Sequence, residues 1–399
     1  MPVPLQQATI GEMLVYSAIE KLNHTFELGP IRPPSEAHSL LIRATRNCPW
    51  NRCLFCPVYK GHKFELRPVS DIVKDIEAAK AISDGIKEIA WRMGHGNRVP
   101  EVAAMLHNQA EFGQCAAHIA LWLSTGGRSA FLQDSNTLVM HTPELTQVIA
   151  FLRQTFPGLD RVTTYGRSHT AARKSLGELK ELRDAGLNRI HIGLETGYEP
   201  LLTYMEKGCT TRDHIEGGKK VKAAGISLCE YVMPGLGGTT MSKEHARETA
   251  RVLNEINPDY IRLRSLHVSP AMTLWTRLQD RDFQLQTEDE VVKEIAVFID
   301  NLKVTSRLKS DHTLNLLMEI QGQMPEDKDK CLSIIDQYLA LPHEERLNFR
   351  FGRRAGYYDT LADLADQPIH EKIDEAIKHL KADDGNAEEA LFRLKNTFI

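Results

Sequence analysis

The chain has 399 residues, of which 42% are hydrophobic, 26% charged and 7% aromatic. These values are typical of globular proteins and exclude collagen-like, coiled-coil and wholly disordered chains. The 49 basic and 53 acidic residues give a formal charge of −4, which argues against a dedicated nucleic-acid binder but still allows a local basic patch.

The sequence shows no pattern of export or membrane insertion. Its first residues, MPVPLQQATIGEML, lack a basic start followed by an apolar run, and no window approaches the roughly 18 apolar residues of a membrane span. Seven cysteines are too few and too unevenly spaced for a secreted disulfide framework. We therefore expect a cytoplasmic protein in a reducing compartment.

Short β-rich runs alternate with amphipathic helical runs, which is the pattern of a parallel α/β sheet or barrel. The first strand is predicted at 39–45, and a helix begins at Pro68 with Ile72, Ile76 and Ala79 on one face. Two helical stretches, 84–93 and 100–124, precede a second strand at 129–133. They form a helical insertion over about 84–125, much longer than the roughly 2–6 residues usual in a βα connection.

From residue 143 the alternation is regular. Helices are predicted at 143–154, 175–186, 199–224 and 243–256, and strands at 161–166, 189–195, 226–233 and 260–268. Gly186 and Gly225 each follow an alanine at the end of a helical run, where a C′ glycine closes a helix. Six strands with helices between them indicate an α/β fold, either a doubly wound sheet or an open partial (β/α)6 barrel of the TIM type. We adopt the barrel as the prediction.

The pattern becomes mainly helical from about residue 288, with helical runs at 288–302, 326–340 and 370–381. We place a boundary near residue 285. The predicted organisation is an N-terminal segment over 1–35, a barrel over 36–285 and a mainly helical C-terminal extension over 286–399.

Three cysteines, Cys48, Cys53 and Cys56, form a C-x4-C-x2-C run in the loop after the first strand. A plain Fe–S electron carrier and a structural zinc site each normally need four ligands. A cubane cluster held by three cysteines instead leaves one iron open, as a site that binds and reduces a small molecule requires. The alternatives are a Cys3His zinc loop completed by His62 and three buried structural cysteines.

This loop, placed directly after the first strand of a six-fold β/α series, resembles the radical S-adenosylmethionine (radical SAM) superfamily. The usual spacing there is C-x3-C-x2-C with an aromatic residue before the last cysteine; Phe55 matches the aromatic residue, and the first gap is one residue longer here. The segments IHIGLETG and YVMPGLGG further resemble the branch of oxygen-independent coproporphyrinogen oxidase and the Elongator catalytic subunit. The resemblance covers roughly residues 36–285.

The resemblance implies an enzyme in which Cys48, Cys53 and Cys56 hold a [4Fe–4S] cluster. An external one-electron reductant such as flavodoxin or ferredoxin would supply the electron for reductive cleavage of S-adenosylmethionine (SAM), and the 5′-deoxyadenosyl radical would take hydrogen from the substrate. We expect a small, anionic metabolite as that substrate. The alternatives are radical modification of tRNA or a peptide, and a non-catalytic Fe–S or zinc-binding protein. The charge of −4 weighs against tRNA.

In a parallel barrel, functional groups gather at the carboxyl ends of the strands. Residues near these ends and in the cysteine loop are the predicted SAM-binding set: Phe55, Gln133, Asp134, Ser135, Tyr165, Arg167, Glu195, Glu230, Gly235, Arg262 and Leu266. Arg167 offers a bidentate group for the SAM carboxylate. The resemblance suggests that Glu195 accepts hydrogen bonds from the SAM ribose or ammonium group.

Several of these residues have structural alternatives. Asp134 is also typical of a surface turn, Arg167 of a solvated surface and Glu195 of a helix cap. Glu230 and Tyr231 lie on opposite faces of a strand, so only one of them points inward. Arg262, Arg264 and Leu266 alternate onto one face, which is either the inner face or a solvated outer one.

Two groups outside this set remain. Arg353 and Arg354 lie beside glycines and tyrosines, where they form either an anion clamp for the substrate or a solvated helix end. Cys209 and Cys229 are candidates for a hydrogen donor or a methyl acceptor, although buried packing is the favoured interpretation. The cysteines outside the trio form no second cluster motif.

Overall fold

The computed structural model describes residues 17–96, 98–107, 113–382 and 386–395. Its centre is one eight-stranded sheet. In spatial order the strands are β1 (Leu40–Arg43), β4 (Ser129–Gln133), β5 (Arg161–Gly166), β6 (Arg189–Glu195), β7 (Ser227–Val232), β8 (Tyr260–Leu263), β9 (Arg307–Lys309) and β10 (Gly322–Gln323). All neighbours from β1 to β9 pair in parallel, and β10 pairs antiparallel at the edge.

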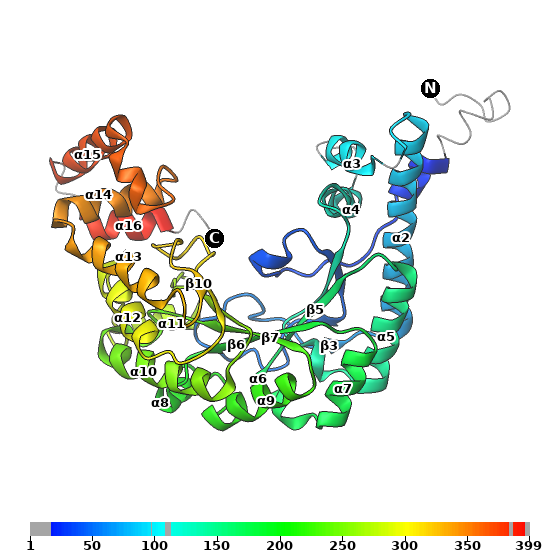
Figure 1. The fold of residues 1–399 in the computed structure, drawn as a ribbon, viewed down its shortest axis with the longest axis horizontal. Coiled ribbons are helices and arrows are strands. Elements are labelled where there is room, and N and C mark those ends of the chain that lie inside the picture. Colours follow the sequence, from blue (N-terminus) through cyan, green and yellow to red (C-terminus); the bar gives the residue numbers. More distant parts are fainter. Residues whose placement is uncertain (1–16, 97, 108–112, 383–385, 396–399) are drawn as a thin grey trace.

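Helices follow the outer side of this curved sheet (Figure 1). They are α2 (Val69–Arg92), α5 (Thr142–Thr155), α7 (Leu176–Asp184), α9 (Thr211–Ala223), α10 (Gly238–Ile256) and α12 (Glu288–Asp300). A doubly wound sheet reverses its strand order at a switch point and carries helices on both faces. Here the order follows the chain without reversal, and these helices lie on one side. The predicted open barrel is therefore confirmed, with two strands more than the six expected.

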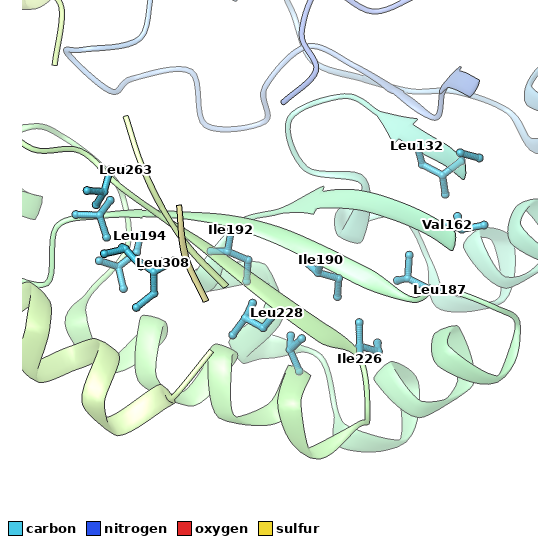
Figure 2. Packing of buried hydrophobic residues seen from close by; sticks show 14 of the residues in the cluster. Leu132, Val162, Leu187, Ile190, Ile192, Leu194, Ile226, Leu228, Leu263 and Leu308 are labelled. Carbon is cyan, nitrogen blue, oxygen red and sulfur yellow. The ribbon is translucent and has the colours of Figure 1, made fainter. Parts of the chain in front are cut away.

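Alternation along the strands decides which side chains face the helices. Ile190, Ile192 and Leu194 of β6 are completely buried and pack in one cluster with Val221 of α9 and Leu253 of α10; Figure 2 shows β6 residues among the neighbouring leucines and isoleucines. Burial of each such side chain contributes about 1.5–3 kcal/mol. Because a slip of one residue would move this whole set to the other face, the packing specifies which residues point into the barrel.

Helix ends follow the local signals of the sequence. Gly186 and Gly225 have φ angles of 113° and 79° just after α7 and α9, as predicted for glycines that close a helix. Capping boxes that begin at Ser175 and Thr210 start the same two helices. Strands 129–133, 161–166 and 189–195 have the predicted bounds.

The helical insertion differs from the prediction. Residues 84–93 are not a separate helix, because α2 continues through them to Arg92. Gly85 lies inside α2, and a side chain does not fit at this position, because a Cβ would come within 2.8 Å of the Ala18 carbonyl oxygen. The stretch predicted as one helix at 100–124 contains α3 (Val99–His107) and α4 (Gln114–Ser124), and residues 108–112 lie outside the described part.

The sixth predicted strand is shorter than expected, because β8 ends at Leu263. Beyond it, the backbone N–H groups of Arg264 and Leu266 donate to the carbonyls of Val232 (2.9 Å) and Pro234 (2.7 Å). The chain thus continues beside the segment that follows β7, and it carries Arg264 and Leu266 past the end of the sheet.

Short elements complete the barrel end. β2 (Thr45–Arg46) and β3 (Glu65–Leu66) pair antiparallel and bracket the cysteine loop. Three short helices lie in strand-to-helix connections: α6 (Ser168–Arg173), α8 (Glu199–Tyr204) and α11 (Thr273–Gln279).

The C-terminal part contains α13 (Lys328–Ala340), α14 (His343–Arg354), α15 (Gln367–Ala382) and α16 (Ala387–Lys395), which Figure 1 shows at one end of the arc. The sheet continues across the expected boundary near residue 285, since β9 pairs with β8 and α12 packs on α10. No helix in the described ranges is both long and apolar enough to cross a membrane.

Candidate active site

A cavity of about 360 Å³ lies at the carboxyl ends of the central strands. This volume falls within the range of roughly 300–1,000 Å³ that is typical of small-molecule sites. Tyr165 of β5, Glu195 of β6 and Tyr231 of β7 line it. The strand end is the place where parallel barrels collect functional groups.

All three cysteines of the loop line this cavity, together with Phe55. The Asp134 carboxylate at the end of β4 holds the loop on the barrel. It accepts hydrogen bonds from the Arg43 guanidinium (2.8 Å), the Asn47 backbone N–H (3.1 Å) and the Tyr59 hydroxyl. The short sequence run and this anchor together bring three thiols to one space.

Asp134 and Gln133 therefore act differently from the prediction that they bind SAM. Asp134 is completely buried; burial raises its pKa, while Arg43 opposes that rise. The Gln133 side-chain oxygen accepts from the Gly29 N–H (2.9 Å), and its amide nitrogen donates to the Ile31 carbonyl (2.8 Å). Both residues lie at the strand end as expected, but other chain segments cover them, so they position those segments rather than line the cavity.

The thiols lie among cationic side chains. Burial raises the pKa of Cys53 and Cys56, while the Lys207 ammonium opposes that rise at both. Lys207 Nζ lies 5.6 Å from the centre of the ring of Phe55, and Phe55 itself belongs to the cysteine loop. Metal coordination deprotonates a thiol, and a nearby cation stabilises the resulting thiolate. Three thiols on one cavity with a cation beside them fit a cluster that is bound through three cysteines.

The zinc alternative gains no support from this geometry. His62 is exposed and does not line the cavity. Four ligands of one tetrahedral zinc ion must lie within about 2.3 Å of that ion. Within the described ranges, no three or more His, Cys, Asp or Glu side chains are close enough to hold a single metal ion.

Glu195 is turned toward the cavity by its backbone. Its φ angle is 61°, in the left-handed region, and the pairing of β6 with β7 is irregular between Gly193 and Glu195. Such bulges redirect side chains and are common beside active sites. Lys207 Nζ lies 3.3 Å from Glu195 Oε1. Burial lowers the pKa of Lys207, but Glu195 and Cys53 raise it more, so its net shift is upward.

Among the described residues, Arg167 and Arg264 are two of the three arginines that line the cavity. Arg167 lies over the Trp50 ring, 5.2 Å from its centre, and donates to the carbonyls of Lys207 (2.5 Å) and Gly208 (3.3 Å). Arg264 is exposed, and no side chain of the described residues forms an ion pair with it. Its charge therefore remains available to a ligand.

The charged side chains that line the cavity are mostly basic. Arg32, Arg167, Lys207 and Arg264 are the cations, and Glu195 is the carboxylate. Ser135 and Leu266, which the sequence also singled out, complete the wall. A cavity with this excess of positive charge favours anionic ligands.

Three further predicted SAM ligands lie outside the cavity. Glu230 is completely buried on the helix-facing side of β7, where burial raises its pKa well above the usual range, and Tyr231 is the residue that points inward. Arg262 is not solvated on an outer face, because it is buried and Asp311 binds it at 2.5 Å. Gly235 donates its N–H to Glu294 (2.7 Å) and borders a separate, smaller cavity.

The predicted anion clamp of Arg353 and Arg354 is wrong. Both side chains are buried, with exposed fractions of 7% and 2%. Arg354 binds Glu288 at 2.5 Å, and Arg350 and Lys395 bind the same carboxylate at 3.0 and 2.8 Å. Arg354 therefore helps to join α12, α14 and α16, and Arg353 lies 3.7 Å from Asp359, so neither is an anion clamp for a substrate.

Lys207, which the sequence did not single out, and Cys209 both line the cavity from the loop between α8 and α9. This loop lies away from the strand ends at which the sequence predicts functional groups. Cys209 was assigned to buried packing, but it lines the cavity. Arg264 had a usable signal, because it alternates with Arg262 along the same strand direction.

His214 is expected to make the stability of the protein dependent on pH. Burial lowers its pKa to about 3 from an ordinary 6.5, and Lys207 and Arg167 lower it further. Because the unfolded chain binds this proton more tightly, the free energy of unfolding falls as pH drops below 6.5. The loss from this group is about 2 kcal/mol between pH 7 and pH 5. Urea unfolding midpoints measured at pH 7 and at pH 5 should differ less in His214→Gln than in the wild type. An equal difference in both proteins would contradict this role of His214.

Comparison with known proteins defines the class. Residues 159–251 match the model of the Radical SAM superfamily. Over this segment the chain is thus similar to the radical SAM superfamily, and the resemblance predicted from the sequence is confirmed. Members of this class are enzymes, and their cofactors are a [4Fe–4S] cluster and SAM, as predicted.

Individual relatives match only part of the chain. A tRNA uridine(34) acetyltransferase of Methanocaldococcus jannaschii is 20% identical over 146 residues, 36% of this chain and 27% of that protein. A biotin synthase of Clostridium botulinum is 31% identical over 124 residues, 30% of this chain and 35% of that protein. The chain therefore spans about a third of the length of these relatives. The solved structure of coproporphyrinogen III oxidase (HemN) from Escherichia coli aligns with a TM-score of 0.41 at 13% identity, over 75% of this chain and 58% of that one.

Proposed function

We propose that this protein is a radical SAM enzyme that modifies a small, anionic metabolite. The observation that carries the proposal is one cavity lined by the three loop cysteines, one carboxylate and four basic side chains. When bound there, the cluster and SAM supply a carbon radical that takes hydrogen from the substrate. The electron comes from an external one-electron reductant of the flavodoxin or ferredoxin type.

The loop cysteines hold the cluster in this proposal. Cys48, Cys53 and Cys56 give three thiolates, and Lys207 lies close enough to affect the pKa of two of them. Its cation stabilises the negative charge that coordination places on the sulfurs. Asp134 anchors the start of the same loop through the Arg43 guanidinium and the Asn47 N–H.

The side chains opposite the loop bind SAM. Glu195 accepts hydrogen bonds from the SAM ammonium group or ribose hydroxyls. Lys207 Nζ lies 3.3 Å from the Glu195 carboxylate and keeps that carboxylate in position. Arg264, whose charge is available, and Arg167 receive the SAM carboxylate. Phe55, Ser135, Tyr165 and Leu266 form the surrounding wall and exclude water from the reacting groups.

The remaining charge favours an anionic substrate. After Lys207 is assigned to the thiolates and Arg167 and Arg264 to the SAM carboxylate, Arg32 of the wall remains for another anion. Burial lowers the pKa of His312, which also lines the cavity, to about 4, with Arg264 as the next cause. His312 is therefore neutral near pH 7 and offers a hydrogen bond rather than a charge.

A second candidate function is radical modification of tRNA, which the partial match to a tRNA uridine(34) acetyltransferase favours. A small metabolite fits inside about 360 Å³, whereas a tRNA must present a single nucleotide to the same cavity. Binding of bulk tRNA at physiological salt, lost at high salt, would favour this second candidate.

The test of the proposed function is anaerobic reconstitution with iron and sulfide, followed by reduction and addition of SAM. We expect a brown protein with a reduced-cluster electron paramagnetic resonance signal that releases 5′-deoxyadenosine. Glu195→Gln removes one charge-assisted contact and should weaken SAM binding by roughly 10- to 100-fold, while the iron content stays at the wild-type level.

Glu216→Gln is the matched control, because Glu216 pairs with Arg212 on the exposed surface of α9, away from the cavity. It should bind SAM as the wild type does. A colourless zinc protein, or a cluster that never yields 5′-deoxyadenosine, would contradict the proposed function. Unchanged SAM affinity in Glu195→Gln would remove Glu195 from the site.

A further inference from the structure

Cys209 is a fourth cysteine on the wall of the cavity that Cys48, Cys53 and Cys56 line. It lies in the loop between α8 and α9, two residues after Lys207. The loop trio is assigned to the cluster, so Cys209 is the thiol of the described wall that the proposed function leaves unused. Cys229 lies in β7, but its side chain is only 1% exposed and does not line the cavity.

One hydrogen bond holds the Cys209 side chain, and a second one fixes its partner His214. Its Sγ lies 3.3 Å from Nε2 of His214, and Nδ1 of His214 lies 2.5 Å from Oγ of Ser168. His214 is completely buried in the first turn of α9, and Ser168 begins α6. The capping box of Thr210 fixes the backbone between Cys209 and His214. The thiol is thus held in one place by two helices, which packing of a buried cysteine does not require.

We propose that Cys209 donates a hydrogen atom to a carbon radical formed in this cavity, an inference that rests on the proposed function. A thiol suits this step because its S–H bond is weaker than the C–H bond that forms. His214 and Ser168 are positioning residues that keep the thiol in place. The step gives the substrate radical a defined fate, namely reduction.

Atoms and electrons balance as follows. The S–H bond of Cys209 breaks homolytically, a C–H bond forms, and the carbon radical becomes a closed-shell product. Cys209 is oxidised by one electron to a thiyl radical. One electron from the external flavodoxin- or ferredoxin-type reductant and one proton from water restore the thiol.

The experiment needs no knowledge of the substrate. Reconstituted full-length protein is reduced with dithionite and incubated with SAM in D2O, where thiols exchange their hydrogen for deuterium. We expect the 5′-deoxyadenosine released by the wild type to carry one deuterium in its methyl group. The measured quantity is the deuterated fraction of the product, so a change in total yield does not affect it.

Cys209→Ser keeps a group of similar size beside His214, but its O–H bond is too strong to give up the hydrogen. The deuterium should be lost from the product of this variant, and also from Cys209→Ala, which serves if the serine variant does not fold. Cys331→Ala, a thiol buried in α13 away from the cavity, should keep the label. The reduced-cluster resonance signal of Cys209→Ser should match that of the wild type.

Four results would overturn the inference. Deuterium retained in Cys209→Ser would exclude the thiol as its source, and loss of deuterium in Tyr231→Phe alone would assign the donor to the phenol that lines the same cavity. An altered cluster signal in Cys209→Ser would make Cys209 a fourth cluster ligand. Absence of 5′-deoxyadenosine from the wild type would overturn the proposed function, and this inference with it.

Discussion

Serine in place of Cys48, Cys53 or Cys56 is expected to abolish cluster binding and SAM cleavage. A hydroxyl is a far poorer iron ligand than a thiolate, and removal of even an indirect partner of a metal ligand typically lowers affinity about 10- to 100-fold. Loss of a direct ligand should therefore lower iron retention and 5′-deoxyadenosine formation by more than about 100-fold. Iron and sulfide analysis after anaerobic reconstitution and gel filtration measures the first effect, and chromatography of the products measures the second.

The matched control is Cys115→Ser. Cys115 is buried in α4, where its thiol donates to the Phe26 carbonyl at 3.2 Å, and it does not line the cavity. It should retain the wild-type content of iron. Equal loss of iron in Cys115→Ser and in the three loop variants would point to general destabilisation and would remove the loop from its assigned role.

Glu288→Gln is expected to destabilise the protein strongly. The Glu288 carboxylate is buried and binds Arg350, Arg354 and Lys395 at 3.0, 2.5 and 2.8 Å. Burial opposes its ionisation, but the three cations hold its pKa far below the usual range. Removing one partner of a buried ion pair typically costs about 3–5 kcal/mol, because it leaves uncompensated buried charge. The free energy of unfolding, from urea titrations at pH 7, should fall by this amount.

Glu389→Gln in α16 provides the comparison. Glu389 forms an exposed pair with Arg393 at 2.6 Å, and exposed pairs contribute only about 0–1 kcal/mol. If both variants lost the same small amount, the Glu288 cluster would not be what joins α12 to α14 and α16.

Local sequence signals were reliable where the chain itself supplies the evidence. The alternation of Ile190, Ile192 and Leu194 in β6 and the glycines that end α7 and α9 correspond directly to the structure. Each of these features depends on residues only a few positions apart. The separate helix predicted at 84–93 was wrong, because α2 continues through Gly85, where the Ala18 carbonyl of a distant segment packs closely.

Predictions of side-chain roles depended on contacts between distant segments. Asp134, Gln133 and Glu230 lie at or in strands as expected, but whether a strand-end residue lines a cavity depends on what covers it. Asp134 is covered by the cysteine loop and Gln133 by the segment at residues 29–31. No pattern along a strand predicts which other segments of the chain will cover such a residue.

The sequence by itself determined the parallel β/α order and the loop with Cys48, Cys53 and Cys56, because strand period and short spacing are local properties. Only the tertiary structure decided which charges face one another. It placed Lys207 and Cys209 on the wall beside the cysteines and took Arg353 and Arg354 into the interior of the C-terminal part. The physical reason is that charge pairing and burial act through space, across segments that the sequence keeps far apart.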